Sequence, residues 1–167
     1  MARYSNRPAR QVQRRRRVWA RQNSAFNLTP GEVSAQSLFA RFQNDITSEL
    51  IGITTVRMIG TFGLHQPVDA ADEFRVYMGI AVVSTRPDKA LGESVPNPAG
   101  QFHADWIYHT VLHPYAEEPF VRQSFDIKSG RKIDEPDEEL VVCAATPVGT
   151  ALTPLVDFHV STLVLLS

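Results

Sequence analysis

The chain has 167 residues with 43% hydrophobic content and a formal net charge of −1, which predicts one compact domain once about 30 highly charged N-terminal residues are set aside. No run of about 18 apolar residues occurs and no apolar segment of signal-peptide length follows the N-terminus, so we expect neither membrane insertion nor secretion. The single cysteine, Cys143, excludes an intrachain disulfide and, within the apolar run 140–145, is expected to be a buried small residue.

Charge is divided unevenly along the chain. The first 31 residues contain eight arginines and no acidic residue, whereas the remainder holds 9 basic and 18 acidic residues, a formal charge of −9. Guanidinium groups pair with phosphates and stack on bases, so a run of Arg without Lys favours a nucleic-acid partner. We predict a disordered or extended arm over residues 1–24 that binds nucleic acid through Arg3, Arg7, Arg10, Arg14, Arg15, Arg16, Arg17 and Arg21.

The arm has other interpretations. An Arg-rich segment without acids is also typical of a mitochondrial presequence, but the apolar face at helical spacing that such a segment needs is nearly absent. The run Arg14–Arg17 also fits a nuclear-import patch, which is compatible with nucleic-acid binding. Trp19 could either stack on an unpaired base or pack under the folded body.

Beyond the arm the dominant period is two, which is the spacing of a half-buried strand. Every even position of 74–82 is apolar, and 156–166 alternates before it becomes apolar on both faces. The region 25–43 should supply a seventh and an eighth strand, although 33–46 could instead hold a short helix. Residues 128–131 predict a hairpin turn. The same strand pattern occurs in 53–64, 104–112, 120–127 and 140–146.

The intervals between these segments are loop-like, and the helices that would connect parallel strands are missing. About eight strands with unequal loops predict an all-β fold, an antiparallel eight-stranded jelly-roll sandwich over residues 25–167. No internal repeat is present, which excludes propellers and solenoids.

An Arg-rich arm ahead of a single small antiparallel β domain resembles the capsid proteins of small icosahedral viruses. The closer similarity is to those of small circular single-stranded DNA viruses, and satellite plant viruses share the plan more loosely. The segments that carry it are 54–60, 74–83, 94–98 and 105–109. The resemblance implies a coat protein of the virion, made in the host cytoplasm with nuclear import as an option. It also implies a homo-oligomeric shell of about sixty copies with arms on a single-stranded DNA or RNA genome.

Two clusters could bind an ion, and both have plainer interpretations. On the predicted strand 104–112 the odd positions place His103, Asp105, His109 and His113 on one side, but residues six apart on a strand are about 20 Å apart, which disfavours a shared metal ion. The acidic run 134–139 offers oxygen ligands without the spacing of a calcium loop, so a solvated loop is the default. With no nucleophile motif or phosphate-binding glycine loop, we expect no enzyme, no cofactor and no metal.

The competing function is a cellular nucleic-acid-binding module with a basic tail and a β-sandwich body. Such modules usually carry positive charge on the folded body as well, whereas this body is at −9. A phage head accessory protein is a third class, in which so basic an arm would be unusual.

Overall fold

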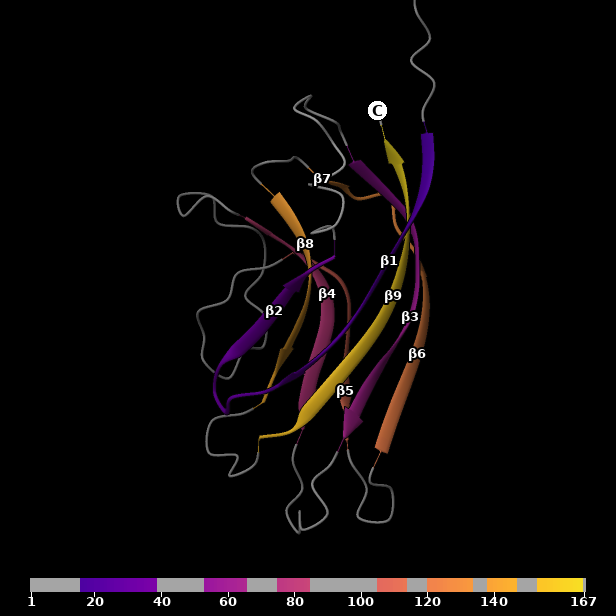
Figure 1. Cartoon of the computed structure of the whole chain (residues 1–167). Helices are drawn as coiled ribbons and strands as arrows, with labels where there is room; N and C mark the ends of the chain where they lie inside the picture. Colours follow the sequence, from indigo (N-terminus) through magenta and orange to yellow (C-terminus); the bar gives the residue numbers. More distant parts are fainter. Residues whose placement is uncertain are drawn as a thin grey trace, which may run out of the picture.

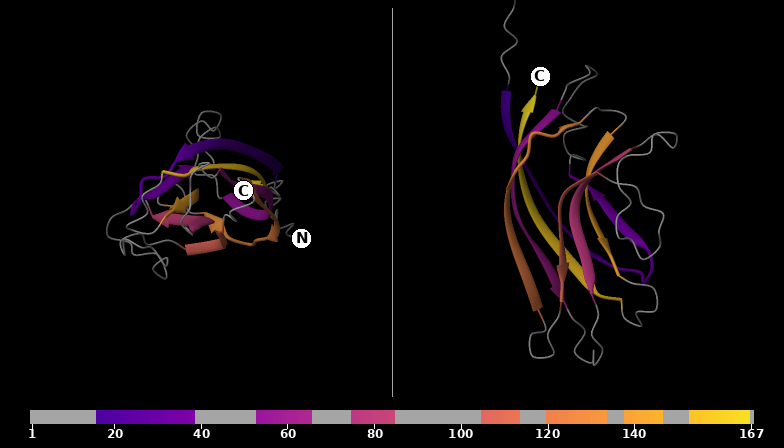
Figure 2. Two further views of the ribbon diagram at one scale, coloured as in Figure 1. Left: turned by 90° about the horizontal axis from the view of Figure 1, so that it is seen from below. Right: turned by 180° about the vertical axis from the view of Figure 1, so that it is seen from behind.

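Two antiparallel sheets packed face to face make up the described part of the molecule (Figures 1 and 2). The computed structural model describes residues 16–38, 53–65, 75–84, 105–113, 120–133, 138–146 and 153–166. Across these ranges no helix occurs that could cross a bilayer. One sheet, called the arm sheet, has the order β1 (Arg16–Asn27), β9 (Leu155–Leu166), β3 (Ile53–His65) and β6 (Phe120–Lys128), with the short β7 (Lys132–Ile133) also paired to β3. The opposite sheet has the order β2 (Val33–Ser37), β8 (Glu138–Ala145), β4 (Val76–Ser84) and β5 (Asp105–Leu112).

The strands pair in a nested order. β1 pairs with β9, β2 with β8, β3 with β6 and β4 with β5, all antiparallel. These nested pairs resemble one long hairpin. The hairpin is folded over on itself, because β9 also pairs with β3, and β8 also pairs with β4. The resulting layers, with the strand orders β1-β9-β3-β6 and β2-β8-β4-β5, have the connectivity of a jelly roll, which confirms the predicted fold class.

All six strands predicted from the period-two pattern are present, with ends within two residues of those expected. Of the seventh and eighth strands expected within 25–43, β2 is present there, whereas the other, β1, lies mostly before that region and overlaps it only at 25–27. Residues 33–37 are a strand rather than the beginning of a helix, and the rest of the alternative helix from residue 39 onward lies outside the described residues.

The boundary expected after residue 24 falls inside β1. This strand pairs with β9 along its whole length, from Arg16 opposite Leu166 to Asn27 opposite Leu155. Ala20 is buried, and Val18 packs against the same core. The outward positions of β1 include Arg17 and Arg21, and the inward positions include the polar Gln22 and Ser24, so the sequence pattern resembles a continuation of the arm. The folded part of the chain therefore begins no later than Arg16.

The predicted hairpin at 128–131 is wrong. β6 and β7 run along β3 in the same direction, with Lys128 opposite Arg57 and Lys132 opposite Thr54. The register of β3 against β9 shifts between Thr55 and Arg57, and next to this bulge the Ser129 amide donates to the Val56 carbonyl at 3.0 Å. A Ser-Gly pair suits an irregular strand segment as well as a turn, and pairing with β3 decides between them.

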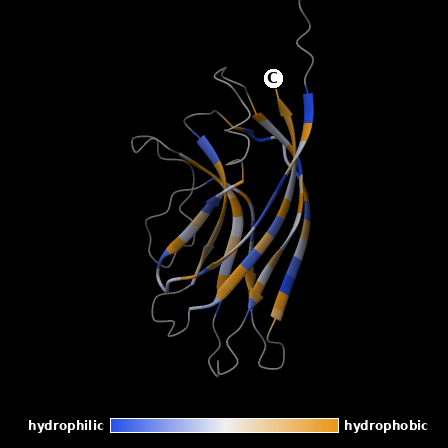
Figure 3. Cartoon of the chain, viewed as in Figure 1, coloured by the Kyte–Doolittle hydropathy of each residue, from blue (hydrophilic) through white to orange (hydrophobic). Residues whose placement is uncertain are grey.

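The core lies between the two sheets and is built by alternate residues of their strands, which appear as alternating bands of hydropathy in Figure 3. At its centre the ring of Phe62 lies 4.8 Å from that of Phe125 and 6.1 Å from that of Tyr108, centroid to centroid. The largest buried side chains also include Phe158, Met58, Met78, Ile80 and Leu140.

β5 departs from strict alternation. Tyr108 lies opposite Ile80 and Trp106 opposite Ala81, so Ile107 is the extra residue of a β-bulge. Trp106 therefore shares a face with His109, with ring centroids 6.1 Å apart, whereas Asp105 pairs opposite the buried Val82. The predicted polar face that joined Asp105 to His109 is thus wrong. Of its other two members, His103 lies outside the described residues, and His113 is exposed directly after the end of β5.

Candidate nucleic-acid interface

Three of the eight predicted nucleic-acid-binding arginines lie on β1. Arg16, Arg17 and Arg21 are all exposed there. The other five, Arg3, Arg7, Arg10, Arg14 and Arg15, lie outside the described residues.

Alternation along β1 sets two of these arginines on the outer face of the arm sheet. Val18 and Ala20 face the core, so Arg17, Trp19 and Arg21 point away from it. The side chain of Trp19 is 47% exposed. Of its two interpretations, packing under the body is therefore excluded, and the indole stands between two guanidinium groups on an open strand face.

Strand register continues this face across the sheet. Trp19 lies opposite Leu163 of β9, which lies opposite Arg57 of β3, which in turn lies opposite Lys128 of β6. Residues in one such row have the same orientation because neighbouring strands are in register. The row therefore carries an exposed indole at the β1 edge and two cations toward the β6 edge.

Both acidic residues on the strands of the arm sheet have basic partners. Arg57 donates to Asp126 through Nε at 2.8 Å and through Nη2, and this hydrogen bonding holds the pKa of the Asp126 carboxyl below its usual value. Asp157 is bonded to Nε2 of His65 at 2.9 Å and lies directly over Gly63, where a Cβ atom would meet Oδ1 at 2.3 Å. The Asp126 carboxylate is therefore paired with a guanidinium, and the Asp157 carboxylate is hydrogen-bonded to an imidazole.

Every Arg and Lys on the described strands belongs to the arm sheet. Its five strands hold seven basic and two acidic residues. The four described strands of the opposite sheet hold three acidic residues and no basic one. Sequence reasoning missed four of the seven, because strand pairing rather than closeness in sequence brings them beside β1. These four are Arg57, Arg122, Lys128 and Lys132.

An open hollow of about 590 Å³ lies on the same face, over β9, β3 and β6. Ser161, which faces Arg21 in the register, forms part of its wall. The remaining lining comes from Ile59, Gly60, Thr61, Ser124, Phe125, Asp126 and His159.

At the far end of β6 a second exposed aromatic has close neighbours. Phe120 is 37% exposed, its ring lies 4.6 Å from that of His65, and the guanidinium of Arg122 sits 4.9 Å above it. Unlike Trp19, this ring is already covered in part by a cation of its own sheet.

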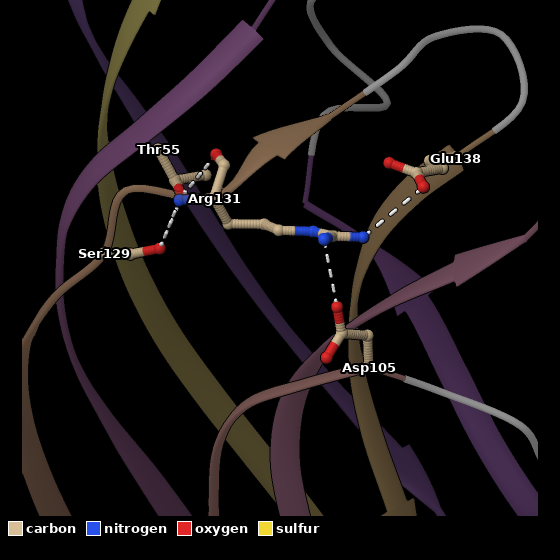
Figure 4. A network of polar contacts seen from close by, with 5 residues as sticks. All are labelled: Thr55, Asp105, Ser129, Arg131 and Glu138. Carbon is tan, nitrogen blue, oxygen red and sulfur yellow. Dashed lines mark hydrogen bonds and ion pairs between the residues drawn. The ribbon is translucent and has the colours of Figure 1, made fainter. Parts of the chain in front are cut away.

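The two candidate ion sites from the sequence analysis do not form a cluster of metal ligands among the described residues. Among the described residues no group of three or more His, Cys, Asp or Glu side chains is placed to hold an ion. Of the acidic run, residues 134–137 lie outside the described ranges, and Glu138 is buried against Arg131 (Figure 4). Burial raises the pKa of the Cys143 thiol to about 12, which makes it a poor nucleophile.

Comparison with known proteins gives distant structural likenesses only. The chain matches no protein-family model, and no curated protein is significantly similar to it. A chain of desmodium yellow mottle tymovirus is 9% identical with a TM-score of 0.37, over 98% of this chain and 95% of that one. A chain of the Macrobrachium rosenbergii (giant freshwater prawn) extra small virus VLP is 8% identical with a TM-score of 0.32, over 98% and 94%. Values this low do not identify a shared function.

Proposed function

We propose that this chain is a viral capsid protein that assembles with copies of itself into a small closed shell and packages single-stranded nucleic acid through its Arg-rich arm. The observation that carries the proposal is the distribution of charge over the sandwich. All seven basic residues of the described strands lie in the sheet whose first strand continues the arm.

A two-sided body of this kind suits the wall of a shell. One side of a shell faces a polyanionic genome and the other faces solvent, so a basic inner and a non-basic outer side avoid opposing fields. The arm sheet meets the first need, and the opposite sheet, with three acidic and no basic residues on its described strands, meets the second. A jelly roll is also an architecture that capsid shells use.

The arm provides the larger share of the charge. A shell of about sixty copies would bring about 480 arginine charges from the eight of each arm, enough to neutralise a substantial part of a single strand of roughly a thousand nucleotides. Contacts between arginine and phosphates carry no sequence information, which suits packaging rather than site-specific binding.

The remaining assignments follow from this role. The protein acts in the virion after synthesis in the host cytoplasm, with the run Arg14–Arg17 available as a nuclear-import patch. The role needs neither a cofactor nor a catalytic residue, and the raised pKa of Cys143 is in keeping with that.

The test is to purify the full chain after expression and to treat it with nuclease. A capsid protein is expected to sediment as a large particle, to keep nucleic acid that the nuclease does not digest, and to show a raised ratio of absorbance at 260 nm to that at 280 nm. A matched variant in which Arg14, Arg15, Arg16 and Arg17 are replaced by Gln is expected to lose most of the protected nucleic acid. Monomers or dimers whose bound nucleic acid is fully digested would instead indicate a cellular binding module.

A further inference from the structure

We propose that Trp19 is a base-stacking platform for single-stranded nucleic acid on the outer face of the arm sheet, with Arg17 and Arg21 contacting the phosphates on either side of the stacked nucleotide. This inference rests on the proposed function, because it assigns a second contact for the same polyanion. The contact is built on β1, which pairs with β9 along its whole length.

The exposure of Trp19 is the first reason. A tryptophan buries a large apolar area when it packs, yet 47% of this one is in contact with solvent. Its neighbour across the sheet is Leu163 of β9, and β1 is the edge strand, so among the described residues no strand pairs with its other side. A base stacked on the indole would remove that apolar surface from water.

Position along β1 is the second reason. Arg17 and Arg21 stand two residues before and two residues after Trp19, each about 7 Å away along the strand and on the same face. Phosphates precede and follow every base in a single strand, so a cation on each side of an aromatic ring matches the alternation of the ligand. Proteins that bind single strands combine aromatic platforms with a basic track in this way.

Local charge is the third reason. β1 contains no acidic residue, and Asp126 lies three strands away, about 14 Å across the sheet. Asp126 is also paired with Arg57, and Asp157 lies opposite Ala25, six residues or about 20 Å along β1 from Trp19. The nearest charges to Trp19 on β1 are therefore those of Arg17 and Arg21, which can pair with phosphates.

The hollow next to β1 indicates the path that a bound nucleic-acid strand would follow beyond Trp19. Ser161 faces Arg21 in the register and lines the hollow, so a strand that leaves Trp19 past Arg21 passes over the hollow next. Its wall offers hydroxyl groups of Thr61, Ser124 and Ser161, which can donate to phosphate or sugar oxygens. Its volume of about 590 Å³ is within the range of small-ligand sites, so it has room for a neighbouring nucleotide.

The experiment measures binding of a fluorescent oligo(dT) of about 20 nucleotides to the full chain, together with quenching of tryptophan fluorescence. The chain has two tryptophans, so Trp19→Phe identifies which one reports. We expect oligo(dT) to quench the wild type, Trp19→Phe to abolish most of the quenching, and Trp19→Ala to weaken binding about tenfold. Phe120→Ala, which removes another exposed aromatic ring from the same face, is expected to leave binding unchanged.

Two charge variants separate the contribution of Arg17 and Arg21 from that of the arginines that precede β1. Arg17→Gln with Arg21→Gln and Arg14→Gln with Arg15→Gln each remove two charges, so each should reduce the slope of log affinity against log salt by about 1.4. Only the first pair should also reduce the quenching of Trp19. A duplex of the same length should cause little quenching, because its bases are already stacked.

Equal affinity of wild type and Trp19→Ala, with no quenching by oligo(dT), would overturn the inference, as would equal quenching by the duplex. Thermal melting of each variant establishes that it is folded, which the exposed position of Trp19 favours. If shells form and protect nucleic acid while oligo(dT) does not quench Trp19, the stacking inference fails and the capsid proposal stands. If Trp19 is quenched while no shell forms, the capsid proposal fails and the stacking site stands.

Discussion

Arg131 reaches from the kink between β6 and β7 to the buried carboxylate of Glu138 at the start of β8, with Nη2 3.4 Å from Oε1 (Figure 4). The same guanidinium lies 3.1 Å from Asp105 on β5 through Nη1. Its backbone carbonyl accepts hydrogen bonds from the amide and the hydroxyl of Thr55 on β3. One residue thereby connects both sheets at one end of the sandwich.

Replacing Arg131 with Met should therefore lower the free energy of unfolding by about 2 kcal/mol. Glu138 would remain buried with its charge less compensated, and the value is set below that of a fully buried pair because a third of the arginine side chain is exposed. Arg57→Met is the matched control: it breaks an exposed ion pair with Asp126 and should change little. Urea unfolding of both variants compares them, and equal effects would mean that the contact at Glu138 adds nothing.

Two N-terminal deletions should behave differently. Removal of residues 1–15 should leave the melting temperature nearly unchanged, because β1 is kept whole. Removal of residues 1–22 takes Val18 and Ala20 from the core and uncovers half of the edge of β9, so it should cost about 3 kcal/mol or more and promote aggregation. Thermal melting with light scattering checks both, and a stable second variant would show that β1 is dispensable to the fold.

The fold was predictable from sequence where one face of a strand is buried and the other is not. Strict alternation located β9 and most of β4, because a one-residue shift would bury the wrong side chains. β1 was harder to recognise, since Arg17 and Arg21 on its outward face continue the arginine run and Gln22 and Ser24 interrupt its inward apolar residues. The bulge at Ile107 could not be predicted either, because the local sequence does not indicate which residue of β5 has no partner on β4.

The candidate site was predictable only in part. The arginine run identified the arm, and with it Arg17 and Arg21. The other basic residues of the arm sheet are far from these in sequence, and the partnership of Arg57 with Asp126 depends on the pairing of β3 with β6. Charge segregation between the two sheets is thus a property of topology, which no single segment of the chain contains.

Gly60 should tolerate no side chain. A Cβ atom there would come within 2.2 Å of the backbone carbonyl oxygen of His159 and within 2.7 Å of the Phe125 ring. Gly60→Ala should therefore cost about 2 to 3 kcal/mol through backbone displacement. Gly130→Ala is the control, because no atom lies within 4 Å of its Cβ position. Chemical denaturation of the two variants should give a clear difference, and similar midpoints would argue against the close packing of β3 on β9.

The buried thiol predicts a specific dependence on pH. The folded state raises the pKa of Cys143 from 9.0 to about 12, so its contribution to stability is complete below pH 9 and is lost as the pH rises through 12. At pH 10 the unfolded state should gain about 1.4 kcal/mol from ionisation of this one group. Cys143→Ala should show a correspondingly shallower fall in unfolding free energy between pH 8 and pH 10, measured by urea titration at each pH. Parallel curves for the two proteins would mean that the thiol ionises in the folded state too.

The most direct test of the capsid proposal is cryo-electron microscopy of the purified full chain with its co-purified nucleic acid. The predicted result is a closed shell about 20 nm across, in which the outer face of the arm sheet, with Trp19, Arg17 and Arg21, lines the lumen next to nucleic-acid density. The absence of closed particles, or a shell in which this basic face lies on the exterior, would contradict it.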